Sequence, residues 1–160
     1  MKYEFKTIDL DTYQLIYTNK DGKKITKEFK RTIEMAEKLD GIVEEARFKL
    51  AEMLSKRGKT KDDFVIKRDD GKGHVTYDET NYIQLEQGVI NDTTGIVVNN
   101  IIKECFGMSL IELMADMGVD INDNSPEIQK EAELFGNKFG MIISGGTDKK
   151  TPSDGKGSKQ

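Results

Sequence analysis

The sequence contains no tryptophan, one cysteine, one histidine and two prolines in 160 residues. A single cysteine excludes an internal disulfide, which fits a reducing compartment. A single histidine excludes zinc sites that are built on two or more histidines. No apolar run approaches the ~18–20 residues that a membrane-spanning helix requires. The N-terminus alternates apolar and polar residues and lacks the apolar stretch of a signal peptide. We therefore expect a soluble cytoplasmic protein with no membrane contact.

The charge is moderately acidic, with a formal net charge of −4. The segment from Gly145 to Gln160 holds four lysines and two aspartates, which leaves the rest of the chain near −6. An acidic body disfavours binding to the phosphate backbone of nucleic acids, and we expect no nucleic-acid partner. The same segment contains no Val, Ile, Leu, Met or aromatic residue and so cannot form a core. We predict one domain over residues 1–144 and a disordered polar tail over 145–160.

Strand signals fill the first thirty residues. Apolar side chains alternate with charged ones from Lys2 to Thr7. The segments Tyr13–Thr18 and Lys24–Phe29 flank a turn in which Asp21 and Gly22 supply the positive φ of a tight hairpin. This pattern predicts a three-stranded antiparallel sheet, or a hairpin plus one strand. Further along, 64–66 and 74–77 flank a glycine-rich turn, which predicts a second small hairpin or an exposed loop.

Helix signals dominate the remaining sequence. Apolar residues recur every three or four positions between Thr32 and Arg57, which predicts one helix of about seven turns that ends at Gly58. The chain is expected to be helical from Thr80 onward. Asp92 or Thr93 is the expected N-cap of a helix that ends at Gly107. Ser109 and Glu112 form the expected capping box of a helix that ends at Gly118, and Ser125 with Pro126 starts the last helix. The predicted fold class is α+β and predominantly helical, with an N-terminal antiparallel hairpin or small sheet packed on a helical bundle.

No group of residues predicts catalysis. His74 lies beside a glycine turn without a recognisable nucleophile, and no phosphate-binding glycine motif is present. The best metal candidate is the twelve-residue segment Asp116–Glu127, which has acids at both ends like a calcium loop. Gly118 and Ile121 stand where that loop needs a ligand and a glycine, and a helix end, a polar loop and a helix start explain the segment equally. We expect no enzyme, no cofactor and no metal, and a buried Cys105.

Two apolar stripes are candidate partner-binding faces. Helix-in-groove recognition uses apolar anchors at helical spacing, but the same spacing also builds a domain's own core. Both readings therefore stay open for the first stripe, which contains Leu39, Val43, Leu50 and Met53, and for the second, which contains Ile128, Phe135, Phe139 and Ile142.

The order of these parts resembles a known family. A strand pair runs into the long helix IEMAEKLDGIVEEARFKLAEMLSKRG, and a polar insertion leads to DETNYIQLE, IIKECFGMSLIELMADMGVDI and a terminal helix. Over residues 1–145 the chain resembles the tail assembly chaperones of siphophages and prophages from Gram-positive hosts. No numbered residue can be carried over from that family.

The resemblance implies a non-enzymatic viral protein that binds the tape measure protein and helps the tail tube protein polymerise around it. It also implies homo-oligomers that act in the bacterial host cytoplasm and are absent from the mature virion. The alternative is another phage structural or interaction protein, either a head–tail junction component or an inhibitor of a host defence complex.

Overall fold

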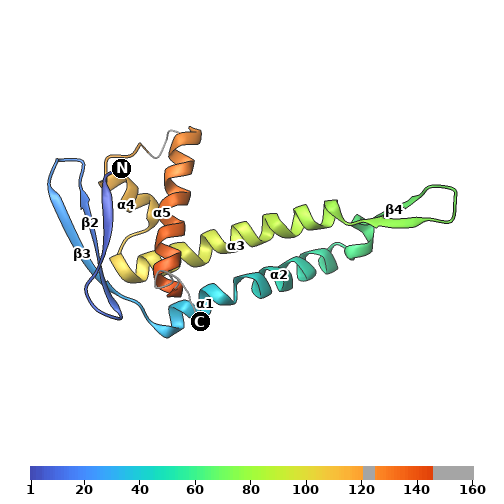
Figure 1. The fold of residues 1–160 in the computed structure, drawn as a ribbon, viewed down its shortest axis with the longest axis horizontal. Coiled ribbons are helices and arrows are strands. Elements are labelled where there is room, and N and C mark those ends of the chain that lie inside the picture. Colours follow the sequence, from blue (N-terminus) through green and yellow to red (C-terminus); the bar gives the residue numbers. More distant parts are fainter. Residues whose placement is uncertain (121–124, 146–160) are drawn as a thin grey trace, which may run out of the picture. The chain divides into compact units, whose positions relative to one another are not determined.

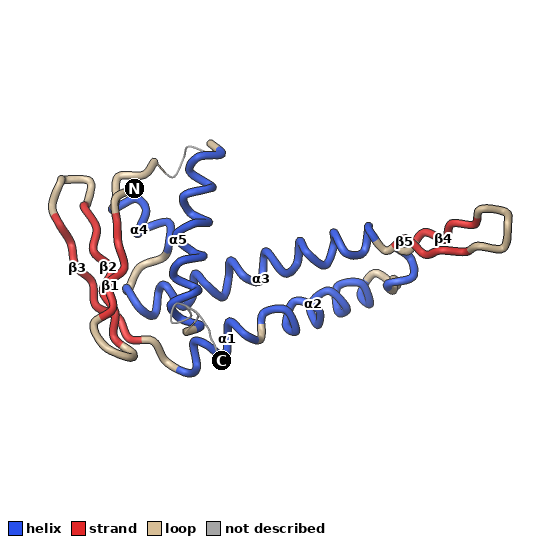
Figure 2. Tube along the Cα trace, viewed as in Figure 1, coloured by secondary structure: helices blue, strands red, loops and turns tan. Residues whose placement is uncertain are grey.

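The computed structural model of the chain describes residues 1–120 and 125–145. Helices and two small antiparallel sheets make up this part of the chain, which confirms the predicted α+β class (Figures 1 and 2). The chain divides into two compact units. Unit 1 contains Met1–Asp40 and the chain from Val97 onward, and unit 2 is Gly41–Ile96. The prediction of a single domain over 1–144 stays a prediction. Beyond Gly145, the predicted disordered tail lies outside the described residues.

Unit 1 begins with the predicted three-stranded antiparallel sheet. Strands β1 (Tyr3–Thr7), β2 (Thr12–Thr18) and β3 (Lys24–Lys30) lie in that order, so β2 is central (Figure 2). Gly22 has a φ of 82° in the β2–β3 turn, as the hairpin prediction requires. On β2 the alternate residues Tyr13, Leu15 and Tyr17 are buried, which gives the sheet one core-facing side.

Helices supply the rest of the core of unit 1. They are α1 (Ile33–Asp40), the C-terminal part of α3 (Thr80–Phe106), α4 (Leu110–Asp116) and α5 (Pro126–Ser144). Phe135 of α5 is fully buried, and its ring centroid lies 5.0 Å from that of Tyr3 and 5.4 Å from that of Phe5. Aromatic packing of this kind fixes α5 against the inner side of the sheet.

Local sequence chemistry sets the helix ends in unit 1 as predicted. Ser109 and Glu112 form a reciprocal capping box at the start of α4. The Ser125 hydroxyl accepts a hydrogen bond from the Ile128 N–H, with Pro126 in the first turn of α5. Gly107 and Gly118, which follow α3 and α4, have positive φ.

Unit 2 consists of two helical segments and a hairpin. Helix α2 (Ile42–Lys56) is followed by a short 3₁₀ turn, η1 (Lys61–Phe64), and by strands β4 (Ile66–Asp69) and β5 (Val75–Asp78). The N-terminal part of α3 then returns alongside α2, and the Arg47 Nε lies 3.4 Å from a Glu86 carboxylate oxygen. The predicted second hairpin is confirmed, and the loop alternative is wrong.

Three predicted boundaries are corrected. The single helix expected over 32–57 is two helices that break at Gly41, the residue with the weakest helix propensity in that segment. The helix start expected at Asp92 or Thr93 does not exist, because α3 runs unbroken from Thr80 and the Thr94 hydroxyl donates to the Ile90 carbonyl at 2.7 Å. Phe64, expected in a strand, belongs to η1.

Candidate protein-binding surface

The first predicted stripe separates into core and surface residues. Leu50 is fully buried in unit 2, and Leu39 packs against the core of unit 1. Val43 and Met53 are 41% and 42% exposed. Val43 and Met53 are therefore the most accessible members of this stripe.

The second predicted stripe is the core face of α5. Three of its members are at most 6% exposed, namely Phe135, Phe139 and Ile142. Ile128 is half-buried. Their neighbours in the core of unit 1 are the sheet aromatics Phe5 and Phe29. We therefore assign Phe135, Phe139 and Ile142 to the core, which was the second reading of this stripe, and not to a partner-binding face.

The helices of unit 2 also carry exposed apolar side chains. We call the following set the unit 2 apolar surface: Val43, Phe48 and Met53 of α2, and Ile83 and Ile96 of α3. All of them are more than 40% exposed, and Phe48 reaches 71%. Val43, Phe48 and Met53 follow one another at intervals of five residues, about 140° around α2, so the set offers exposed apolar contact points on several sides of the two helices and is not one continuous patch.

The geometry of α2 explains why Phe48 is exposed. The buried residues Ile42, Ala46, Leu50 and Leu54 recur at every fourth position and form one stripe. At about 100° per residue, Phe48 lies roughly 180° from the centre of that stripe. A pair of helices buries only one face of each, so an aromatic residue on the far face of α2 stays in solvent.

Helix α3 carries an apolar surface wider than one neighbouring helix covers. Tyr82, Val89 and Ile96 follow one another at intervals of seven, and Ile83 and Ile90 form a parallel row. In these rows Val89 and Ile90 are half-buried, whereas the Ile83 side chain is 58% exposed. A stripe this broad suits a helix that contacts more than one apolar neighbour.

Unit 2 also contains ion pairs. Besides the Arg47–Glu86 pair, Lys49 lies 3.4 Å from Glu45, and Lys61 lies 2.8 Å from Glu79. The hydrogen bond with Glu79 and its negative charge raise the pKa of Lys61.

The residues considered for chemistry lie apart from one another along the chain. His74 is in the β4–β5 turn, where its Nδ1 lies 2.8 Å from an Asp70 carboxylate oxygen and its side chain is 78% exposed. Hydrogen bonds, first from the Lys72 N–H and then from His74, lower the pKa of Asp70. Cys105 is half-buried in α3, and burial raises the pKa of its thiol to about 12. A thiol with so high a pKa is a poor nucleophile at neutral pH.

The candidate calcium segment is only partly described. Asp116 belongs to α4, where its carboxylate accepts a hydrogen bond from the Tyr17 hydroxyl and its carbonyl accepts one from the Lys20 N–H at 2.7 Å. Burial, together with this carboxylate, raises the pKa of Tyr17 far above its ordinary value. Residues 121–124 of the segment lie outside the described residues. Over residues 1–120 and 125–145, no three His, Cys, Asp or Glu side chains gather into a metal-binding group.

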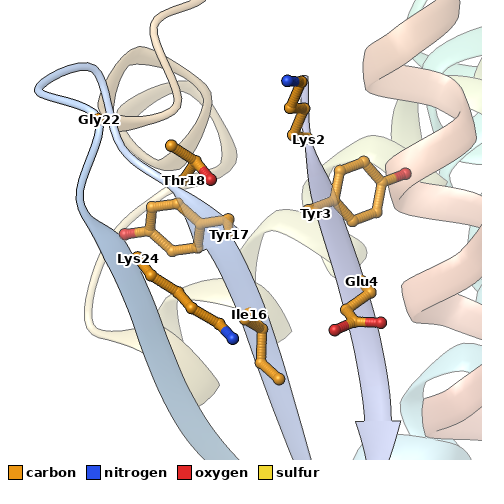
Figure 3. Close-up of a pocket in the computed structure, with 8 residues that line it drawn as sticks. All are labelled: Lys2, Tyr3, Glu4, Ile16, Tyr17, Thr18, Gly22 and Lys24. Carbon is orange, nitrogen blue, oxygen red and sulfur yellow. The ribbon is translucent and has the colours of Figure 1, made fainter.

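A hollow of about 350 Å³ lies on the sheet of unit 1 (Figure 3). Lys2, Glu4 and Lys24 surround it with mixed charge, beside the apolar Ile16. We assign this hollow no function.

No family model matches the chain, and comparisons with curated proteins and with solved structures give no match. The resemblance to tail assembly chaperones therefore stays a prediction. None of the helices in the described ranges combines the length and the apolar character needed to cross a bilayer.

Proposed function

We propose that this protein is a tail assembly chaperone of a siphophage or prophage. The chaperone binds the tape measure protein in the bacterial host cytoplasm while the tail tube protein polymerises around the tape measure protein. The chaperone acts by binding and not by catalysis. The observation that carries this proposal is the unit 2 apolar surface, above all the exposed Phe48. The choice of the tail assembly chaperone family is based on the order of strands and helices along the chain.

The chemistry of this surface suits an elongated helical client. Exposed apolar side chains on the outside of helices can contact the apolar face of a partner helix, as in helix-in-groove recognition. Tape measure proteins of such phages are long and helical, so a chaperone needs a surface that covers apolar helical segments until the tube encloses them. The flexible thioether of Met53 and the flat ring of Phe48 suit a client whose sequence varies along its length.

Co-expression with the tape measure protein of the same phage tests the proposal. We expect the wild-type chain to increase the soluble fraction of the tape measure protein, and Phe48→Ala to reduce that gain. Leu10→Ala is the matched control, because Leu10 is 90% exposed in the β1–β2 connection and also loses an apolar side chain. The proposal fails if the tape measure protein is equally insoluble with and without this chain.

A second measurement separates the chaperone from a structural component. The chaperone is absent from finished particles, so purified virions should lack this chain by mass spectrometry. Finding it there in stoichiometric amount would favour the head–tail junction alternative.

A further inference from the structure

Strand β1 is an edge of the unit 1 sheet, and its outer backbone groups find no partner in the part of the chain that the structure describes. The Thr18 N–H donates to the Lys2 carbonyl and the Ile8 N–H donates to the Thr12 carbonyl, so the even-numbered residues of β1 bond to β2. The N–H and C=O groups of Tyr3, Phe5 and Thr7 therefore point away from the sheet. Within the described residues these groups have no hydrogen-bond partner.

A groove of about 390 Å³ runs beside this edge. Tyr3, Phe5 and Thr7 line it from β1, and Lys138, Met141 and Ile142 line it from α5. Figure 3 shows the Tyr3 ring directed toward the neighbouring helix, with Glu4 of the same strand to one side. An unpaired strand edge next to a helix is the arrangement that receives an added strand in β-augmentation.

The helical wall of the groove continues into exposed apolar side chains. Met141 and Leu134 are 53% and 52% exposed and lie seven residues apart, which places them on the same side of α5. Lys138 lies between them, with its Nζ 5.3 Å from the centre of the Tyr3 ring. An added strand at this edge would have both hydrogen-bonding and apolar contacts.

The charges of β1 select a second copy of the same strand. In an antiparallel pair centred on Phe5, Glu4 of each copy faces Lys6 of the other. A pair centred on Glu4 or on Lys6 would instead place like charges opposite each other. The Phe5-centred register also brings the free groups of Tyr3, Phe5 and Thr7 into about six hydrogen bonds.

We propose that two copies of this protein pair through β1 in the Phe5-centred register and join their three-stranded sheets into one of six strands. The interface is two-fold symmetric and self-complementary, as in most homodimers. The two α5 helices then lie on the same side of the joined sheet, where Leu134 and Met141 enter the contact. This inference rests on unit 1 alone and does not depend on the proposed function.

A charge-swap series measured by analytical ultracentrifugation tests the interface. The wild-type chain should sediment as at least a dimer of the 18.1-kDa chain. Glu4→Lys and Lys6→Glu each place like charges at both cross-strand positions, and each should weaken dimerisation at least about tenfold. Both side chains are exposed on the outer side of the sheet, so neither change should alter the fold.

The double variant Glu4→Lys, Lys6→Glu restores opposite charges and should recover wild-type dimerisation. An equimolar mixture of the two single variants should form a heterodimer for the same reason. A wild-type chain that stays monomeric at the highest concentration measured would overturn the proposal, and so would single variants that dimerise as well as wild type. If the β1 edge instead binds a strand of an unrelated protein, the wild-type chain alone should stay monomeric.

Disulfide trapping tests the register independently. Glu4→Cys mixed with Lys6→Cys should give a cross-linked heterodimer under mild oxidation, because non-hydrogen-bonded pairs bring Cβ atoms within about 4.5–5.5 Å. Glu4→Cys alone should cross-link far less. Equal cross-linking in the two samples would exclude the Phe5-centred register.

Discussion

Truncating Phe135 and Phe48 to alanine removes the same side-chain atoms from two opposite environments. Phe135 is fully buried and contacts the rings of Tyr3 and Phe5, whereas Phe48 is 71% exposed. A buried Phe→Ala change costs about 3–5 kcal/mol. The two aromatic contacts place Phe135 in the upper part of that range, because each ring pair adds ~0.5–1.5 kcal/mol beyond its buried area. An exposed substitution changes stability by about 0.5 kcal/mol or less.

Urea unfolding at fixed protein concentration measures both variants. For a slope of ~2 kcal/mol per molar urea, Phe135→Ala should lower the midpoint by about 2 M and Phe48→Ala by less than about 0.3 M. Near-UV circular dichroism is the appropriate signal, because Tyr3, Tyr13 and Tyr17 of unit 1 pack in or against the core. If Phe135→Ala costs less than about 1 kcal/mol, the assignment of this residue to the core is refuted.

Three further predictions concern single groups. Tyr3→Phe should stabilise the protein by about 1 kcal/mol in the same assay, because the buried Tyr3 hydroxyl has no hydrogen-bond partner among the described residues. A loss of stability would contradict this prediction and show that the hydroxyl is hydrogen-bonded. Hydrogen bonds from Thr80 and Arg68 lower the pKa of Asp78 to about 2, so the stabilisation from this carboxylate is full above the unfolded pKa of 3.8 and disappears as the pH falls toward 2. Carbon-13 NMR titration should show this shift, and a midpoint near 3.8 would contradict it. Cys105, with a thiol pKa raised to about 12, should react slowly with a thiol reagent at pH 8 in the native protein and rapidly after denaturation, and equal rates would contradict its burial.

Local signals in the sequence were sufficient to predict much of the fold. The capping box of Ser109 with Glu112, the Ser125 cap and the Gly22 turn all depend on residues within four positions of one another. Such contacts depend little on the rest of the fold, so the β2–β3 hairpin and the ends of α4 and α5 could be predicted, whereas the pairing of β1 with β2 stayed one of two alternatives. The Gly41 break was missed because one glycine costs only ~1 kcal/mol in a helix, and packing decides whether the helix continues.

Periodicity predicted only Val43 and Met53 of the candidate surface. Leu50 and Met53 belong to one stripe, yet Leu50 is fully buried and Met53 is 42% exposed. Helical spacing shows which residues share a face but not what lies against that face. Phe48 lay outside the stripe and was missed, although a large aromatic residue among Glu44, Glu45 and Glu52 is an available signal for a binding site.

The dissociation constant for the tape measure protein tests the central claim most directly. Biolayer interferometry should compare wild type, Phe48→Ala and Leu10→Ala on one immobilised segment of that protein. A central aromatic contact contributes about 2 kcal/mol or more to binding, so Phe48→Ala should weaken it at least about tenfold, while Leu10→Ala stays within about twofold of wild type. Unchanged affinity for Phe48→Ala, or no binding by the wild-type chain, would contradict the role assigned to the unit 2 apolar surface.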